Sequence, residues 1–391
     1  MRENNKKEKK KLFGLGPNVI ILGVVSFFQD VASEMIYPLL PFFLADVLRA
    51  NKVLIGLIEG IAESSASVFK TLSGWLSDRF KRRKGLILGG YSISSANKPL
   101  LSLTVSWWQV LALRFSDRVG KGLRTAPRDA LIADVTPVDQ RGRAFGFHRA
   151  ADTLGAVVGP LLAFLLLPLL NNNYRIIFLI SFLPALASVL LIFLVREKKT
   201  LHSEKKVALK FLFDRKFTFF LLVVTIFALG NSSDVFLLLR AQNLGMVLKY
   251  VPLAYLIFNL VYTLVSLPAG IISDKIGRKP LLIMGYLIFA LTYLAFAASP
   301  SIFYLWILFV FYGIYRGVTD ALERALVVDL VPQEKRGTAL GIYHTAVGLA
   351  LLPASIMGGV LWEVLSPSAT FLYGTVTAFL SAALLLFLKT R

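Results

Sequence analysis

The 391-residue chain contains no cysteine, which excludes disulfides and thiolate metal sites. Charged residues are also scarce, because they make up 17% of the sequence where soluble proteins have about a quarter. No nucleophile motif, metal-ligand spacing or phosphate-binding loop stands out, so we expect neither an enzyme nor a bound metal or cofactor. The composition is not that of a soluble catalytic domain.

Hydrophobic residues make up 56% of the chain and gather in long continuous runs. Runs of about 20 apolar residues match a hydrocarbon core roughly 30 Å thick, at about 1.5 Å per helical residue. Because the runs do not alternate, they favour helices over the strands of a barrel. We therefore predict an all-α membrane protein with twelve transmembrane helices. They cover residues 17–46, 53–77, 85–105, 107–134, 144–170, 175–195, 217–241, 251–273, 280–299, 301–330, 338–365 and 367–388.

The net charge of +20 is distributed unevenly along the chain. If the twelve spans alternate in direction, 28 of the 43 Lys and Arg fall in segments on one side of the membrane and four on the other. This asymmetry follows the positive-inside rule and puts both termini in the cytoplasm. It argues against nucleic-acid binding and predicts a multi-pass protein of a bacterial-type inner (cytoplasmic) membrane, in contact with lipid.

The second half of the sequence repeats the first. DVTPVDQRGRAFGFH, from Asp134, recurs 195 residues later as DLVPQEKRGTALGIY, from Asp329. GWLSDRFKRRKGLILGG, from Gly74, recurs 196 residues later as GIISDKIGRKPLLIMGY, from Gly270. A duplicated unit of six spans keeps its orientation in both copies, because six is an even number. We predict a basic N-terminus, two six-helix bundles and a cytoplasmic linker between them, at residues 1–16, 17–195, 217–391 and 196–216.

The chain resembles the major facilitator superfamily over nearly its whole length. The family's loop motif G-x-L-x-D-R/K-x-G-R/K-R/K is almost intact from Gly270 to Lys279. It occurs again from Gly74 to Arg83, with Lys81 where the family prefers glycine. The resemblance implies a twelve-helix transporter of bacterial type, in which two bundles rock about a site at the membrane midplane.

The resemblance also implies a gating role for charges at the cytoplasmic helix ends. In the family, the Asp and the later Arg of the loop motif join an acidic residue at the end of the fourth helix, and the cluster holds one access state. The alternative is an exposed ion pair, which contributes at most about 1 kcal/mol. The matching residues are Asp78, Arg82 and Asp134, and in the second half Asp274, Arg278 and Asp329.

Two carboxylates interrupt the first apolar run, FFQDVASEMIYPLLPFFL. Asp30 and Glu34 are one helical turn apart, so they share a face, which Tyr37 continues. A carboxylate at mid-bilayer depth needs a cavity, a cation or a proton. Since the family's first, fourth, seventh and tenth helices surround the central cavity, we expect both carboxylates to carry protons there. The alternative is that they only hold the first helix to its neighbours.

The fourth predicted span is unusually basic. Arg114, Arg118 and Lys121 lie on one helical face, and Arg124 lies beside Lys121. The stretch from Arg114 resembles the family's R-F-x-Q-G-x-G-x-G, although Asp117 replaces Gln and Arg118 replaces the first Gly. The motif arginine is linked with proton coupling. The added cations favour an anionic or zwitterionic substrate.

The seventh and tenth predicted spans add further charges, including Asp234 in the seventh. Acidic and basic residues within the spans are nearly equal in number, so many of them could simply pair with one another. The proton-coupling candidates are Asp30, Glu34, Arg114, Asp234 and Asp320, and the substrate-binding candidates are Tyr37, Arg118, Lys121, Arg124, Arg316 and Glu323.

The direction of transport is suggested by Gly155, Gly159 and Pro160, which resemble the antiporter motif G-x-x-x-G-P. Ordinary packing of small residues would explain them equally well. We expect proton-coupled export of a small solute by a monomer, with the proton gradient as the energy source. The alternatives are proton-coupled uptake of an organic anion or a metal chelate, and a membrane sensor or scaffold that does not transport.

Overall fold

The computed structural model describes residues 15–80, 83–137, 140–197, 215–332 and 335–388, and its secondary structure there is helical throughout. The all-α fold class is therefore confirmed. The helices are α1 (Pro17–Ile36), α2 (Leu40–Phe42), the π-helix η2 (Phe43–Val47), α3 (Lys52–Phe80), α4 (Arg83–Ser102), α5 (Trp107–Val135), α6 (Arg141–Leu169), α7 (Tyr174–Ile180), α8 (Phe182–Ile192), α9 (Arg215–Gly230), α10 (Val235–Asn243), the 3-10 helix η4 (Leu248–Tyr250), α11 (Val251–Ile276), α12 (Arg278–Ala298), α13 (Ile302–Asp329), α14 (Arg336–Val364) and α15 (Pro367–Phe387).

Nine stretches in the described part of the chain are long and apolar enough to cross a membrane. Three further predicted spans correspond to α3, α4 and α5, which have 29, 20 and 29 residues but are too polar to meet the same criterion. Several charges of these helices pair with residues of neighbouring helices, as described below. The total of twelve transmembrane helices and the cytoplasmic termini stay predictions.

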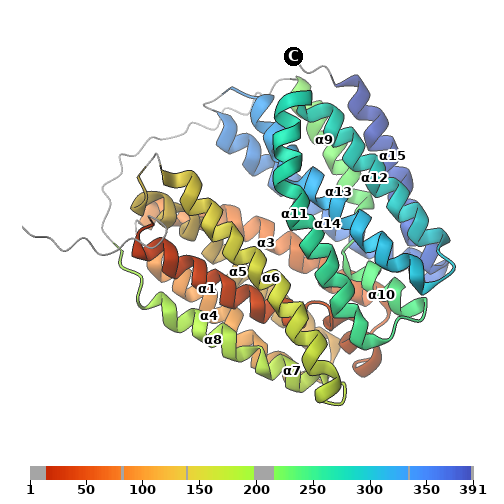
Figure 1. The fold of residues 1–391 in the computed structure, drawn as a ribbon, viewed down its shortest axis with the longest axis horizontal. Helices are drawn as coiled ribbons and strands as arrows, with labels where there is room; N and C mark the ends of the chain where they lie inside the picture. The colour runs from red at the N-terminus through yellow and green to blue at the C-terminus, as the bar shows by residue number, and fades with distance from the viewer. Residues whose placement is uncertain (1–14, 81–82, 138–139, 198–214, 333–334, 389–391) are drawn as a thin grey trace, which may run out of the picture.

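The helices form two groups, which Figure 1 shows in red to yellow-green and in green to blue. In the first group α1 packs against α6, and α5 packs against both α3 and α4. In the second group α11 packs against α13, and α12 packs against α13 and α15. The bundle limits predicted at residues 195 and 217 stay predictions, because most of the linker lies outside the described residues.

The two groups meet where α3 packs on α14 and α6 packs on α11. Glycines bring the backbones of α3 and α14 into direct contact. A Cβ added at Gly56 would lie 2.1 Å from the carbonyl oxygen of Ser355, and one at Gly359 would lie 2.4 Å from that of Lys52. Farther along, the Ser64 hydroxyl donates to the Gly348 carbonyl over 2.6 Å. Small residues are what allow two membrane helices to approach this closely.

Candidate functional site

A cavity of about 420 Å³ lies between the two helix groups. Asp30 and Glu34 of α1 and Lys121 of α5 line it from the first group, and Asp234 and Arg316 line it from the second. Of the sequence-predicted coupling and binding residues, eight line this central cavity: Asp30, Glu34, Tyr37, Arg118, Lys121, Arg124, Asp234 and Arg316. The structure thus brings together most of the charges that the sequence distributes over several helices.

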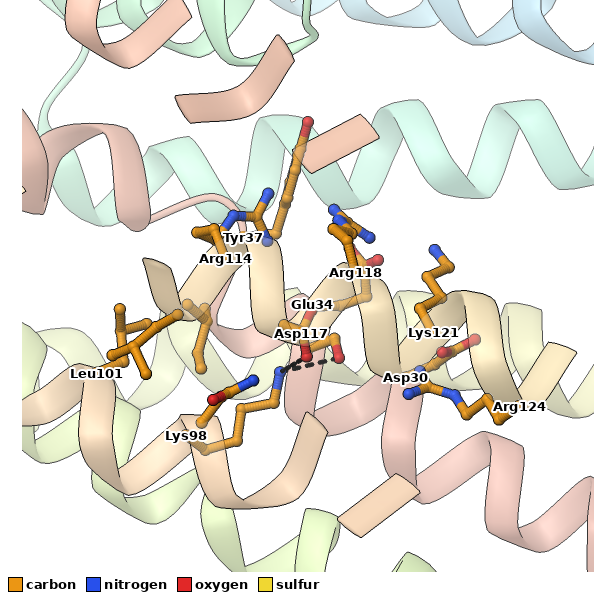
Figure 2. A pocket seen from close by; sticks show the side chains of 14 residues that line it. Asp30, Glu34, Tyr37, Lys98, Leu101, Arg114, Asp117, Arg118, Lys121 and Arg124 are labelled. Atoms are coloured by element: carbon orange, nitrogen blue, oxygen red, sulfur yellow. Dashed lines mark hydrogen bonds and ion pairs between the residues drawn. The ribbon is translucent and has the colours of Figure 1, made fainter. Parts of the chain in front are cut away.

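A smaller pocket of about 50 Å³ adjoins the cavity within the first group, and Figure 2 shows its side chains. Arg114 lines this pocket and not the central cavity. Asp320 and Glu323 line a third pocket, of about 160 Å³, within the second group. These three predicted residues are therefore set apart from the main site.

Several buried cations of the first group are bound to carboxylates of neighbouring helices. Arg114 donates to both oxygens of Glu59 on α3, at 2.6 to 3.1 Å. Arg118 lies 2.8 Å from Glu63, and Lys98 of α4 pairs with Asp117 at 3.6 Å, drawn as a dashed line in Figure 2. Because a buried ion pair satisfies both partners, these cations hold α3, α4 and α5 together. The predicted role of Arg114 in proton coupling stays a prediction.

Three predicted cations make no ion pair with a described residue: Lys121, Arg124 and Arg316. Arg124 donates to the Ser94 hydroxyl over 2.5 Å, and its guanidinium lies 4.6 Å from the centre of the Tyr91 ring. Lys121 is exposed to the cavity. In Figure 2 the Asp30 carboxylate lies beside Lys121 and Arg124, both of which attract it electrostatically. Positive charge is thus available to a ligand.

Asp30 and Glu34 line both the cavity and the smaller pocket, and neither forms an ion pair with a described residue. The Oε2 atom of Glu34 is buried without a hydrogen-bond partner. Lys121 and Arg118 both attract the Glu34 carboxylate, and Tyr255 lies near it. Two enclosed carboxylates that are held in no ion pair within the described part of the chain are well placed to take up protons.

The glycines of the G-x-x-x-G-P stretch bring α6 against α1 at these two carboxylates. A Cβ added at Gly155 would lie 2.9 Å from the Cβ of Asp30, and one at Gly159 would lie 2.7 Å from the Cβ of Glu34. Sequence reasoning did not connect the motif with the carboxylates, because nothing local shows which helix α6 packs against. The contact places the motif directly behind the two acidic side chains.

Carboxylates of the second group are held by tyrosines. Tyr312 donates to Asp234 over 2.6 Å, and Tyr262 donates to Asp320 over 2.9 Å. Asp320 also pairs with Arg324 at 2.6 Å.

Glu323 is buried between two phenols. It accepts hydrogen bonds from Tyr286 at 2.9 Å and from Tyr343 at 2.5 Å, and it forms no ion pair with a described residue. If Glu323 binds substrate as predicted, it must do so from the third pocket and not from the central cavity.

The predicted gating pairs are found in part. Arg278 lies 2.7 Å from Asp329, as the family resemblance implies. In the first half Asp134 pairs with Arg83, one residue after the predicted Arg82. Arg82 itself and the side chain of Asp78 lie outside the described residues. Asp274 is exposed at the end of α11 and forms no ion pair with a described residue. The gating function of all six residues stays a prediction.

Most of the uncharged polar residues that line the cavity were not identified from the sequence, among them Asn231, Ser232 and Asn259 of the second group. These three residues carry no charge that would mark them within an apolar span. A local signal exists, because the stretch GNSSD at Gly230 to Asp234 is a poor continuation of an apolar helix, and the structure breaks the helix there. Four charged residues also line the cavity and were not among the predicted site residues: Glu63, Arg128, Arg149 and Asp152.

Comparison with known proteins agrees with this architecture. The family model described as Major Facilitator Superfamily matches residues 22–247 and 233–391. The chain is 38% identical to MJ1317, an uncharacterized MFS-type transporter of Methanocaldococcus jannaschii, over 99% of this chain and 98% of the other. The chain therefore belongs to the major facilitator superfamily of transporters and is an integral, multi-pass membrane protein.

More distant relatives have described roles. The chain is 28% identical to the cis,cis-muconate transport protein of Acinetobacter baylyi, over 83% of this chain and 84% of the other. It is 33% identical to the multi-drug resistance efflux pump PmrA of Streptococcus pneumoniae, over 38% of each chain. The solved structure of the nucleoside transporter NupG superposes with a TM-score of 0.78 at 15% identity, covering 96% of this chain and 100% of the other, and supports the fold alone.

Proposed function

We propose that this transporter carries a small organic anion across the membrane together with protons, by alternating access between the two helix groups. The observation that carries the proposal is the pair Lys121 and Arg316. They line one cavity from opposite groups, and neither forms an ion pair with a described residue. An anion held between them would bind both groups at once, which couples its binding to their relative position.

The charge balance of the cavity supports coupling to protons. If every lining group is ionised, the cavity has an excess of one positive charge. The cations are Arg118, Lys121, Arg124, Arg128, Arg149 and Arg316, and the acids are Asp30, Glu34, Glu63, Asp152 and Asp234. Ionised Asp30 and Glu34 compete with a ligand anion for the same cations. Protonation of either therefore strengthens anion binding, and by linkage the anion strengthens proton binding.

Ligands that favour each other's binding move together, so this linkage favours symport, which drives uptake when protons flow inward. The A. baylyi relative with a named dicarboxylate cargo is consistent with an anionic substrate. The proposal includes a monomer in a cytoplasmic-type membrane, with the proton gradient as the only energy source and no bound cofactor. It also includes the pairs Arg83–Asp134 and Arg278–Asp329 as contacts that change with the access state.

Proton-coupled export is the second candidate function. It is favoured by the partial match to PmrA and by the packing of Gly155 and Gly159 behind the two carboxylates. Export by antiport requires that substrate and protons exclude each other. That condition fits a substrate whose positive end competes with protons for Asp30 or Glu34. The two candidates therefore differ in the sign of the proton movement.

The test is proton flux in proteoliposomes that contain a pH-sensitive dye in the lumen. Addition of cis,cis-muconate or another organic anion outside is expected to acidify the lumen of vesicles with the wild-type protein. Removal of both carboxylates by Asp30→Asn with Glu34→Gln is expected to abolish this acidification. Anion flux with no proton movement in the wild type would overturn the coupling, and lumen alkalinisation would favour export by antiport.

A matched pair of variants tests the cationic site itself. Lys121→Gln should lower anion uptake by about tenfold or more, since a hydrogen bond to a charged group contributes roughly 1.5–3 kcal/mol. Lys121→Arg keeps the charge and should retain most of the uptake. Equal uptake by wild type and Lys121→Gln would exclude Lys121 as an anion ligand.

A further inference from the structure

The seventh predicted span is broken in the middle of the protein. α9 ends at Gly230 and α10 begins at Val235, and the residues between them are not helical. Asn231 and Ser232, on this non-helical segment, both line the central cavity. Irregular backbone at membrane depth is tolerated only where protein or a water-filled cavity surrounds it. The break therefore presents polar groups to the space where a ligand would bind.

Three polar side chains on this wall are buried and have atoms without hydrogen-bond partners. Asn231 is 8% exposed, and one end of its amide donates to Tyr315 over 3.0 Å, while its Oδ1 atom is unpartnered. Ser232, 4% exposed, has an unpartnered hydroxyl. Asn259 of α11 is 8% exposed and has an unpartnered Nδ2. Tyrosines lie near two of these side chains, Tyr293 near Ser232 and Tyr255 near Asn259. The Asn231 oxygen has no such neighbour among the described residues. Since buried polar atoms are nearly always satisfied, these side chains are available to hydrogen-bond a ligand in the cavity.

The opposite wall of the cavity has a different chemistry. Lys121 and Arg124 of α5 line it from the first helix group and form no ion pair with a described residue. The cavity thus has these two cations on the α5 side, whereas the α9–α10 break presents neutral donors and acceptors next to Asp234, with Arg316 as the cation of that group. A ligand that satisfied both walls would have an anionic end and a neutral, hydrogen-bonding end.

The unpartnered atoms limit what that second end can be. The Asn231 oxygen requires a donor, the Asn259 nitrogen requires an acceptor, and the Ser232 hydroxyl can serve as either. A hydroxyl group both donates and accepts, so adjacent hydroxyl groups of one ligand can supply what each of the three requires. A second carboxylate cannot donate when ionised, and an ammonium group cannot accept. An alkyl chain would leave all three atoms unsatisfied, at a cost of roughly 1–3 kcal/mol each.

The geometry points to a hydroxylated organic acid as the cargo, with its carboxylate on the α5 side and its hydroxyl groups at the break between α9 and α10. This assignment rests on the proposed function, which supplies the anionic end of the ligand. It adds the residues Asn231, Ser232 and Asn259 as the groups that distinguish a hydroxylated acid from a plain one.

The test compares matched anions that differ only in hydroxylation, by equilibrium binding to the purified full-length protein. The pairs are gluconate with hexanoate, and malate with succinate. In each pair the wild type should bind the hydroxylated member about tenfold more tightly, because a site built around hydrogen bonds rejects an analogue that lacks them. 6-Aminohexanoate, which offers an ammonium group instead, should bind no better than hexanoate.

Variants of the subsite should remove the preference and not the binding. Asn231→Leu and Asn259→Leu are each expected to bring the affinity ratio within each pair close to one. Asn97→Leu is the matched control, because Asn97 is also buried with an unpartnered Nδ2 but lines the smaller pocket, and it should keep the wild-type ratio. A size-exclusion profile and the melting temperature identify any variant that fails to fold. If one of the two Asn→Leu variants fails, the affinity ratio of the other tests the subsite.

The outcomes separate this inference from the proposed function. Equal binding of hydroxylated and plain acids by the wild type would overturn this inference alone. Tight binding of 6-aminohexanoate would also overturn it, because it would indicate that Asp234 binds an ammonium group at the break. Failure of every anion to bind would overturn both this inference and the anionic substrate.

Discussion

The two helix groups satisfy their buried carboxylates in different ways. In the first group Glu59, Glu63 and Asp117 are paired with arginine or lysine. In the second group Asp234, Asp320 and Glu323 accept hydrogen bonds from tyrosine hydroxyls, and the ion pair of Asp320, with Arg324, lies within its own helix. The halves share a repeated sequence, so this difference lies in the side chains and not in the helix arrangement.

The difference predicts which group responds to protons. When the carboxylate of an ion pair takes up a proton, it leaves a buried cation without a partner, and that is costly. When a carboxylate held by a phenol takes up a proton, the phenol can still accept a hydrogen bond from it. We therefore expect protonation to reorganise the first group and to leave the second largely unchanged.

The largest effect is expected for Glu59→Gln. It removes the negative partner of Arg114, whose side chain is buried, and should lower the free energy of unfolding by about 3–5 kcal/mol. The measurement is the melting temperature in detergent. As a control, Glu59→Leu combined with Arg114→Met should recover much of the loss, because no charge is then left alone. A wild-type melting temperature for Glu59→Gln would show that the ion pair is not structural.

A smaller effect is expected for Tyr343→Phe in the second group. It removes the donor to Oε2 of Glu323 and leaves the Tyr286 donor to Oε1 in place, so the loss of stability should be about 1–3 kcal/mol. The same melting experiment applies. If Tyr343→Phe destabilised the protein as much as Glu59→Gln does, the proposed contrast between the two groups would fail.

The smallest effects are expected at the paired helix ends. The Asp329 side chain is 47% exposed and that of Asp134 is 14% exposed, so Asp329→Asn should cost less than about 1 kcal/mol and less than Asp134→Asn. Added salt should reduce the effect of Asp329→Asn further, since it screens exposed charges. Asp274→Asn, which changes no ion pair with a described residue, is the control. A larger loss of stability for Asp329→Asn than for Asp134→Asn would contradict the expectation that the more buried pair contributes more.

Much of this structure could be predicted from the sequence, because long apolar runs and an internal repeat are visible along the chain. The i, i+4 spacing of Asp30 and Glu34 was enough to place both on one face toward a cavity. The partner of Arg118 was not predictable, since Glu63 is distant in sequence and several carboxylates were equally eligible. The site of Glu323 was also out of reach, because its two tyrosines come from α12 and α14. Pairing depends on tertiary contacts that a single helix does not reveal.

The seam between α3 and α14 has a mechanical consequence. Where glycine lets backbone lie on backbone, as at Gly56 and Gly359, tilting one helix over the other requires few side chains to change rotamer. In the proposed alternating access, this contact can serve as the pivot about which the two helix groups rotate. A Cβ added at Gly56 or Gly359 would push the two backbones apart, so if the groups move as proposed, these glycines are where the contact between them is kept.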